Sequence, residues 1–111
     1  MKSRIRDNPN FSDYQDVLIY YEQVQEKDSL AVWAQKALDD FSYQPHPYLY
    51  LGKAKYQQNQ LLDAVNILLE GYDFIFDDIG LKARFALEVA LVYQALEKKD
   101  KAKEWAKKAR H

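Results

Sequence analysis

The feature that most constrains the fold of this chain is a spacing that recurs three times. Two core positions have the same separation in each of three segments: Leu18 and Leu30, Gly52 and Ala64, Ala90 and Ala102. The first two segments are offset by roughly 34 residues, a period that is the signature of stacked repeats. The third segment follows after the same interval plus four positions. We therefore expect three copies of one supersecondary unit.

The middle segment, Pro45–Gly71, indicates what that unit is. Pro45 and Pro47 suit the first turn of a helix, because a proline there loses no intrahelical hydrogen bond. Apolar residues then recur with helical spacing on both sides of a break at Asn59 and Gln60. The unit is therefore predicted to be two helices joined by a tight turn, with small residues at the core positions where the helices cross.

This unit resembles a tetratricopeptide repeat. The pattern of that family has a large residue, a Leu-Gly pair, an aromatic residue three positions later, and an Ala-x3-Phe motif in the second helix. The matching residues are Tyr48, Leu51, Gly52, Ala64 and Leu68, and Lys55 stands at the aromatic position with Tyr56 beside it. The resemblance covers about 11–110. It implies an all-α fold, a right-handed α-α superhelix of three stacked pairs.

The resemblance also divides the chain. Residues 1–10 are expected to be a flexible leader, followed by one domain at 11–111 with repeats at about 11–44, 45–80 and 81–111. Four extra residues must lie between Ala64 and Ala90, because the interval from the second segment to the third is four residues longer than the interval from the first to the second. The natural place is Tyr72–Gly80, as an extended second helix or a longer connection. The short alternation at 73–77 is read as a helix end or loop.

Capping residues predict where helices begin. Ser12 with Gln15 resembles a capping box that opens a helix at about 13–25, and Asp28 or Ser29 is expected to cap the next helix. The last pair is expected at about Leu81–Glu97 and Lys99–Arg110. Trp105 is the one large apolar residue of the final helix, so we expect it to pack into the third pair. Gly71 and Gly80 are interpreted as helix ends or bends.

The sequence contains no recognisable catalytic or metal-binding motif. There is no cysteine and no glycine-rich phosphate loop, and His46 lies between two prolines, where a solvated loop residue is expected. The acidic pairs at 39–40 and 77–78 are interpreted as solvated charges, because paired carboxylates need environments that separate their pKa values to do acid-base work. We therefore expect no enzymatic activity and no cofactor. The cellular compartment stays open.

Charge and hydropathy argue against nucleic acid and against membrane insertion. The net charge is −1 at pH 7, and no apolar run approaches the ~20 residues that a membrane span needs. Residues 79–111 hold nine basic and four acidic residues, but the lysines alternate with alanine and glutamate as on a solvated helix face. The acidic remainder of the chain could favour a weak head-to-tail association through the terminal helices, which salt would screen.

The family resemblance implies a protein or peptide ligand in a concave groove lined by the first helices. The residues at the matching positions are Gln15, Ile19, Glu22, Gln23, His46, Leu49, Tyr50, Lys53, Gln57, Arg84, Leu87, Glu88 and Leu91. Exposed Leu49, Tyr50 and Leu91 are expected there. Lys53 and Arg84 are the only cations of the set, enough for an isolated acidic side chain. Gln15 and Ile19 stand where a chaperone carboxylate clamp needs Lys and Asn, so no such clamp is expected.

Two functions remain open at this stage. One is a peptide-binding groove in a scaffold, and the other is a structural segment of a longer repeat array that self-associates through its terminal helical faces. The segments 44–75 and 81–109 resemble repeats of longer, frequently exported bacterial proteins, especially of the Bacteroidetes group. That resemblance implies an assembly or scaffolding role. An apolar groove favours the first function, and apolar terminal faces favour the second.

Overall fold

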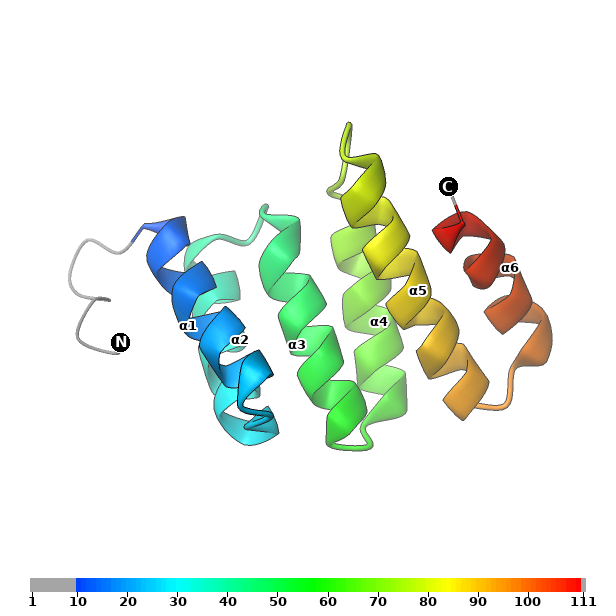
Figure 1. The fold of residues 1–111 in the computed structure, drawn as a ribbon, viewed down its shortest axis with the longest axis horizontal. Coiled ribbons are helices and arrows are strands. Elements are labelled where there is room, and N and C mark those ends of the chain that lie inside the picture. The colour runs from blue at the N-terminus through cyan, green and yellow to red at the C-terminus, as the bar shows by residue number, and fades with distance from the viewer. Residues whose placement is uncertain (1–9, 111) are drawn as a thin grey trace.

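The computed structural model describes residues 10–110 of the 111-residue chain. Within this range it contains six α-helices and no strand, which confirms the all-α prediction. In chain order they are α1 (Phe11–Gln23), α2 (Lys27–Asp40), α3 (Pro45–Gln57), α4 (Leu61–Tyr72), α5 (Ile79–Ala95) and α6 (Lys99–Ala109) (Figure 1). The expected leader lies outside the described residues, except for Asn10.

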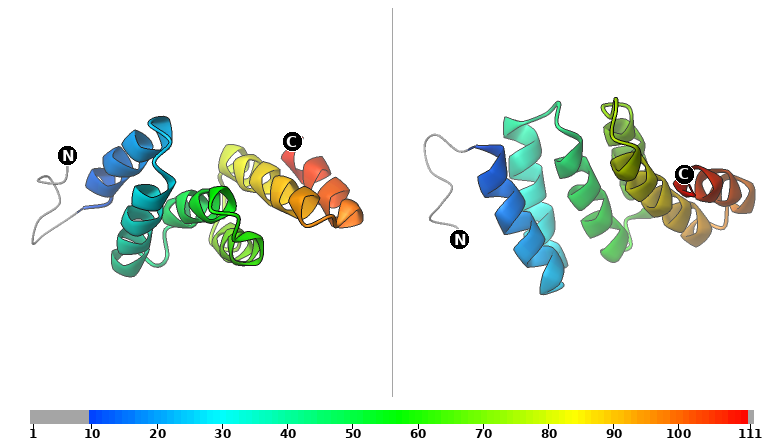
Figure 2. Two further views of the ribbon diagram at one scale, coloured as in Figure 1. Left: turned by 90° about the horizontal axis from the view of Figure 1, so that it is seen from below. Right: turned by 45° about the horizontal axis from the view of Figure 1, so that its top comes forward.

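Helices that follow each other in the chain also pack against each other. Three antiparallel pairs form, α1 with α2, α3 with α4 and α5 with α6, and α2 packs on α3 as α4 packs on α5. The central helix α3 also touches α1 and α5. Seen from below, the row of helices curves, with α1, α3 and α5 along one side and α2 and α4 on the other (Figure 2). The first helices of the three pairs therefore share one face.

The three tight turns within the pairs have the same geometry. Gln25, Asn59 and Glu97 each adopt a left-handed conformation, with φ of 58°, 62° and 62°. The amide of the next residue donates to a carbonyl five positions back in each turn, at 3.0, 2.8 and 2.9 Å, as in a Schellman motif. The turn residues recur at the same two intervals as the core positions in the sequence. The recurring spacing thus corresponds to a recurring turn.

The four extra residues lie within the predicted interval, but they do not extend the second helix. α4 has 12 residues and α2 has 14, whereas α5 has 17 against 13 in α1 and in α3. The longer helix is therefore the first helix of the third pair, which gains a turn at its N-terminus. Of the two predicted alternatives, the extended second helix is wrong and the longer connection is confirmed, because 73–78 connects α4 to α5 where the shorter 41–44 connects α2 to α3.

Helix starts differ from the predicted capping residues. Asn10, not Ser12, caps α1: its Oδ1 accepts from the Asp13 amide at 3.1 Å and from Ser12 Oγ at 2.7 Å. Asp78 caps α5 by accepting from the Leu81 amide at 2.9 Å. α2 begins at Lys27 without a side-chain cap, before the expected Asp28 or Ser29. The first helix therefore starts slightly earlier than its sequence signal suggested.

The core consists of two apolar clusters that meet at α3. One contains Tyr50, Leu51 and Ala54 of α3 packed with α1 and α2, and the other joins Tyr48 and Leu49 of α3 to α4, α5 and α6. A helix placed between neighbours on several sides buries most of its surface. Seven of the 13 residues of α3 are buried, so this helix has no single apolar face.

Glycine and tryptophan positions show how closely the pairs pack. A Cβ atom at Gly52 would lie 2.5 Å from Leu68 Cγ, which confirms a close helix crossing there. Gly71 lies in the last turn of α4 and is also a second close crossing, because a Cβ there would collide with Tyr48 of α3. Trp105 packs edge-on to Tyr72 at 5.0 Å between ring centroids, so the expectation that it packs inward is confirmed.

Candidate interaction surface

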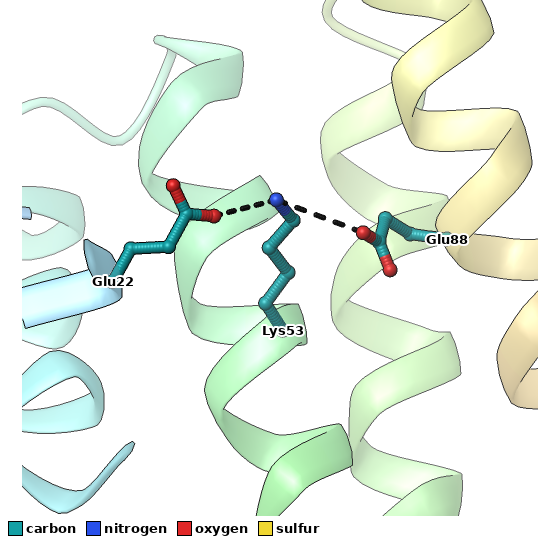
Figure 3. Close-up of polar contacts among 3 residues, drawn as sticks. All are labelled: Glu22, Lys53 and Glu88. Atoms are coloured by element: carbon teal, nitrogen blue, oxygen red, sulfur yellow. Dashed lines mark hydrogen bonds and ion pairs between the residues drawn. The ribbon is translucent and has the colours of Figure 1, made fainter. Parts of the chain in front are cut away.

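The three first helices meet at a charged triplet formed by Glu22, Lys53 and Glu88. Lys53 projects from the middle of α3 toward both neighbours (Figure 3). Its Nζ lies 2.6 Å from Glu22 Oε2 on α1 and 3.6 Å from Glu88 Oε1 on α5. One cation therefore connects a residue from each of the three pairs. This arrangement ties the first helices together at the centre of the α1/α3/α5 face.

The triplet carries a net negative charge, because two carboxylates face one ammonium group. Burial raises the pKa of Glu88 above its ordinary value, and the charge of Lys53 opposes that shift. Lys53 is therefore not a free cation as the sequence suggested. Because its ammonium group is already paired with two carboxylates, an incoming acidic side chain would have to displace one of them.

Exposed apolar residues lie on both sides of Lys53 in the repeat register. Ile19 on α1 and Leu91 on α5 occupy the positions equivalent to Lys53 in the first and third pairs. Their exposed fractions are 40% and 42%, and Leu87, one turn before Leu91, is also exposed. The expectation of an exposed Leu91 is confirmed. The α1/α3/α5 face thus combines a negative centre with apolar residues at its two margins.

Two of the predicted contact residues are buried. Leu49 is 0% exposed and Tyr50 is 5% exposed, which contradicts the prediction that they line an open surface. Leu49 packs toward α4 and α5, and Tyr50 packs toward α1 and α2. The central helix is held between neighbours on both sides, so its flanking positions belong to the core. Neither side chain is available to a ligand.

His46 and Arg84 lie at the end of this face where α3 and α5 begin. His46 is in the first turn of α3, not in a solvated loop, and is half-buried with its ring 5.7 Å from that of Phe11. Burial lowers the pKa of His46, and the nearby charge of Arg84 lowers it further. Its buried Nδ1 has no hydrogen-bond partner among residues 10–110. Arg84 is exposed.

The other predicted residues contribute less. Gln15 is half-buried, and Gln23 and Gln57 are exposed. Of the acidic pairs, Asp78 is a helix cap, and Asp40 accepts a 2.5 Å hydrogen bond from the Tyr14 hydroxyl. The structure therefore gives these two carboxylates local structural partners, where free solvated charges were expected.

Some properties of the site could not be found by sequence reasoning. The steps from Glu22 to Lys53 and from Lys53 to Glu88 are each three positions shorter than the corresponding repeat interval. The ion pairs of Lys53 therefore depend on the direction in which each side chain leaves its helix, and no spacing in the sequence indicates that direction. Glu22 and Glu88 were predicted as separate surface residues, and only the structure brings them to one cation.

Residues 10–110 contain neither a cluster of metal ligands nor a membrane-spanning helix. No three His, Asp or Glu side chains in this part of the chain converge as potential metal ligands. None of its helices combines the length and the apolar character that a membrane span requires. The chain matches no protein-family model, and no curated protein is significantly similar to it in sequence. The site is therefore interpreted from its own residues.

Proposed function

We propose that this chain is a protein-interaction module of the tetratricopeptide type, a right-handed superhelix of three pairs that binds a peptide segment along the face formed by α1, α3 and α5. Three sequential pairs with equivalent turns support that assignment. The observation that carries the binding proposal is the Glu22–Lys53–Glu88 triplet with exposed Ile19 and Leu91 at its margins. The module is proposed to act by binding alone, without catalysis.

The chemistry of this face selects a ligand with one basic side chain. The triplet has one negative charge in excess, so a Lys or Arg of the ligand can bind its carboxylate oxygens while Lys53 stays in place. Ile19 and Leu91 would receive apolar side chains on either side of that residue. We infer a segment with the pattern apolar, basic, apolar. The acidic ligand suggested by Lys53 and Arg84 in the sequence is disfavoured.

The binding face is organised before a ligand arrives. The ion pairs of Lys53 link α1, α3 and α5, and the close crossing at Gly52 fixes α3 on α4. A rigid surface loses less conformational entropy on binding than a flexible one, which favours affinity for extended segments.

Peptide selection tests the proposal. Peptides would be selected from a random display library on the wild-type chain, and their affinities measured by fluorescence anisotropy. We expect enrichment of one Lys or Arg between apolar residues. Ile19→Asp should weaken binding roughly tenfold or more, because a carboxylate replaces apolar contact. Replacing the basic residue of the peptide by Gln should have a similar effect.

A matched control separates the proposed face from the rest of the surface. Leu62 is an exposed leucine on α4, which is not part of the α1/α3/α5 face, so Leu62→Asp introduces the same charge outside the proposed binding surface. We expect it to leave peptide affinity unchanged. Peptides whose affinity is insensitive to Ile19→Asp, or falls equally with Leu62→Asp, would place the binding site elsewhere and overturn the proposal.

A further inference from the structure

An apolar hollow lies at the C-terminal end of the row, between α5 and α6. It has a volume of about 350 Å³, and its apolar lining includes Leu87, Ala90, Ala102 and Ala106. Two lysines of α6, Lys99 and Lys103, form part of its wall. Leu87 is exposed although the surrounding positions are small and apolar. This end of the row therefore presents an apolar surface edged by positive charge.

The two preceding pairs show what covers the equivalent surface. Positions 102 and 106 of α6 correspond to Ala64 and Leu68 of α4, which pack against α5. In the first pair the corresponding residues are Leu30 and Ala34, which pack against α3. In both cases the cover is the first helix of the next pair. The hollow between α5 and α6 thus lies where the first helix of a following pair would pack.

The chain contains one first helix whose outer side is still available, namely α1. Tyr20 occupies the place in α1 that Ala54 has in α3 and Val92 has in α5, and both of those residues are buried against the preceding pair. Tyr20 is exposed, as is Val24 one turn later. The side of α1 that would meet a preceding pair therefore exposes apolar surface.

Side-chain sizes at these positions are complementary. The covering residues become larger from Ala54 to Val92 to Tyr20. The third pair, like the first, has alanine (Ala106, Ala34) at the position where the second pair has Leu68. Alanine at this position leaves more space in the hollow between α5 and α6 than leucine would, and a tyrosine ring can fill that space. Close packing without voids is what distinguishes specific apolar contacts from adventitious ones.

The charges of the two ends are also complementary. Residues 11–40, which form α1 and α2, contain seven acidic and two basic residues. Residues 98–110, which form α6 and its ends, contain seven basic and two acidic residues. Opposite fields on two surfaces steer their association and disfavour a like-with-like contact. A contact of α6 with the α1/α2 end is therefore favoured over a contact between two α6 ends.

We propose that the hollow between α5 and α6 is a docking site for α1 of a second copy of this chain, with Tyr20 in the hollow and Lys99 and Lys103 facing the acidic α1/α2 end. The contact is heterologous, so it leaves one free end on each copy and builds open head-to-tail chains. It uses neither the Lys53 ion pairs nor Ile19, but Leu91, at one margin of the peptide-binding face, also lines the hollow. The two proposals are therefore tested at different residues, this one at Tyr20, Lys99 and Lys103.

The test is the solution mass of the intact chain by light scattering and sedimentation, across a concentration series at low and high salt. We expect the average mass to rise with concentration and to fall at high salt. The double charge reversal Lys99→Glu, Lys103→Glu and the single change Tyr20→Lys should each weaken the association roughly tenfold or more. All three positions are exposed, so the variants are expected to fold, which circular dichroism would verify.

Matched controls carry the same charge changes outside the two surfaces. Lys98→Glu, Lys107→Glu repeats the double reversal at α6 positions away from the hollow, and Tyr43→Lys replaces an exposed tyrosine between α2 and α3. Both controls should associate like the wild type. Equal loss in the controls would show that net charge alone governs the mass, and would overturn the proposed contact.

Mixing the two blocked variants gives the decisive result. The Tyr20→Lys chain keeps an intact hollow, and the Lys99→Glu, Lys103→Glu chain keeps an intact α1. Each alone should remain a monomer, and the mixture should form a one-to-one heterodimer that grows no further. A wild-type chain that stays monomeric at every concentration would overturn the proposal. Self-association of either blocked variant alone that is as strong as that of the wild type would do the same.

Discussion

The packing at Gly71 gives the most direct test of the helix arrangement. A Cβ atom at this position would overlap Tyr48 Cβ and would lie 2.8 Å from Tyr48 Cγ and 2.9 Å from Phe85 Cε2. Tyr48 Cβ is fixed to the backbone of α3, and Phe85 is fully buried, so neither can give way by rotating a flexible end. Gly71→Ala must therefore move α3 and α4 apart.

The magnitude follows from two opposing effects. Overpacking a well-packed core costs about 1–3 kcal/mol, and a rigid obstacle points to the upper part of that range. Replacing a helical glycine by alanine contributes at most about 1 kcal/mol in the opposite direction, and less in the last helical turn, where Gly71 lies. We therefore expect Gly71→Ala to lower the free energy of unfolding by about 2 kcal/mol.

Urea unfolding, followed by far-ultraviolet circular dichroism and by tryptophan fluorescence, measures this change. Gly80→Ala is the matched control, because its nearest neighbouring atom, Asp78 Oδ1, is 3.6 Å away. In the first turn of α5 the same substitution should raise the free energy of unfolding by about 0.5 kcal/mol. The two variants are thus expected to have opposite signs. A Gly71→Ala chain as stable as the wild type would refute the close crossing of α3 and α4.

Three further predictions concern the turns, the first pair and the charged triplet. Gln25→Gly and Glu97→Gly should each raise the unfolding free energy in urea by roughly 0.5–1 kcal/mol, because both residues have positive φ; no gain would show that these turns are not left-handed in solution. Burial and the hydrogen bond to Asp40 raise the pKa of Tyr14 to about 12, so stability should fall as the pH rises from about 10 to 12. Tyr14→Phe should cost about 1 kcal/mol below that range and make the fall smaller, which pH-dependent unfolding would detect; burial also raises the pKa of Tyr48, so part of the fall should remain. Lys53→Met should lower the free energy of unfolding in urea by about 1 kcal/mol at neutral pH, because it leaves carboxylates without their partner. The loss should be smaller at acidic pH, where Glu88 is protonated and no longer needs a cation. An equal loss at both pH values would contradict the pairing.

Much of the fold could be predicted from the sequence because the repeat intervals reflect backbone geometry. The left-handed turn must recur wherever the pair recurs, so the same two intervals separate the core positions and separate Gln25, Asn59 and Glu97. Helical periodicity likewise placed six helices with small errors at their ends. The capping prediction failed at α1 because Asn10 accepts the hydrogen bond from the Asp13 amide, while the Ser12 hydroxyl donates to Asn10 and caps no amide among residues 10–110.

The candidate site was less predictable because it depends on contacts between helices. A surface helix has one apolar face, but α3 is enclosed by α1, α2, α4 and α5, so its pattern does not reveal which side is open. Leu49 and Tyr50 were therefore assigned to the surface although both are buried. The charge at Lys53 was misinterpreted for a similar reason: its partners come from other helices at separations that do not follow the repeat.

The central proposal is that the α1/α3/α5 face of this chain binds a peptide segment. Nuclear magnetic resonance of the isotope-labelled chain, titrated with a selected peptide, tests it directly. We predict that the amide shifts change most around Ile19, Glu22, Lys53, Glu88 and Leu91, on three helices that are distant in sequence. Changes confined to α2 and α4, or to α6, would contradict the proposal.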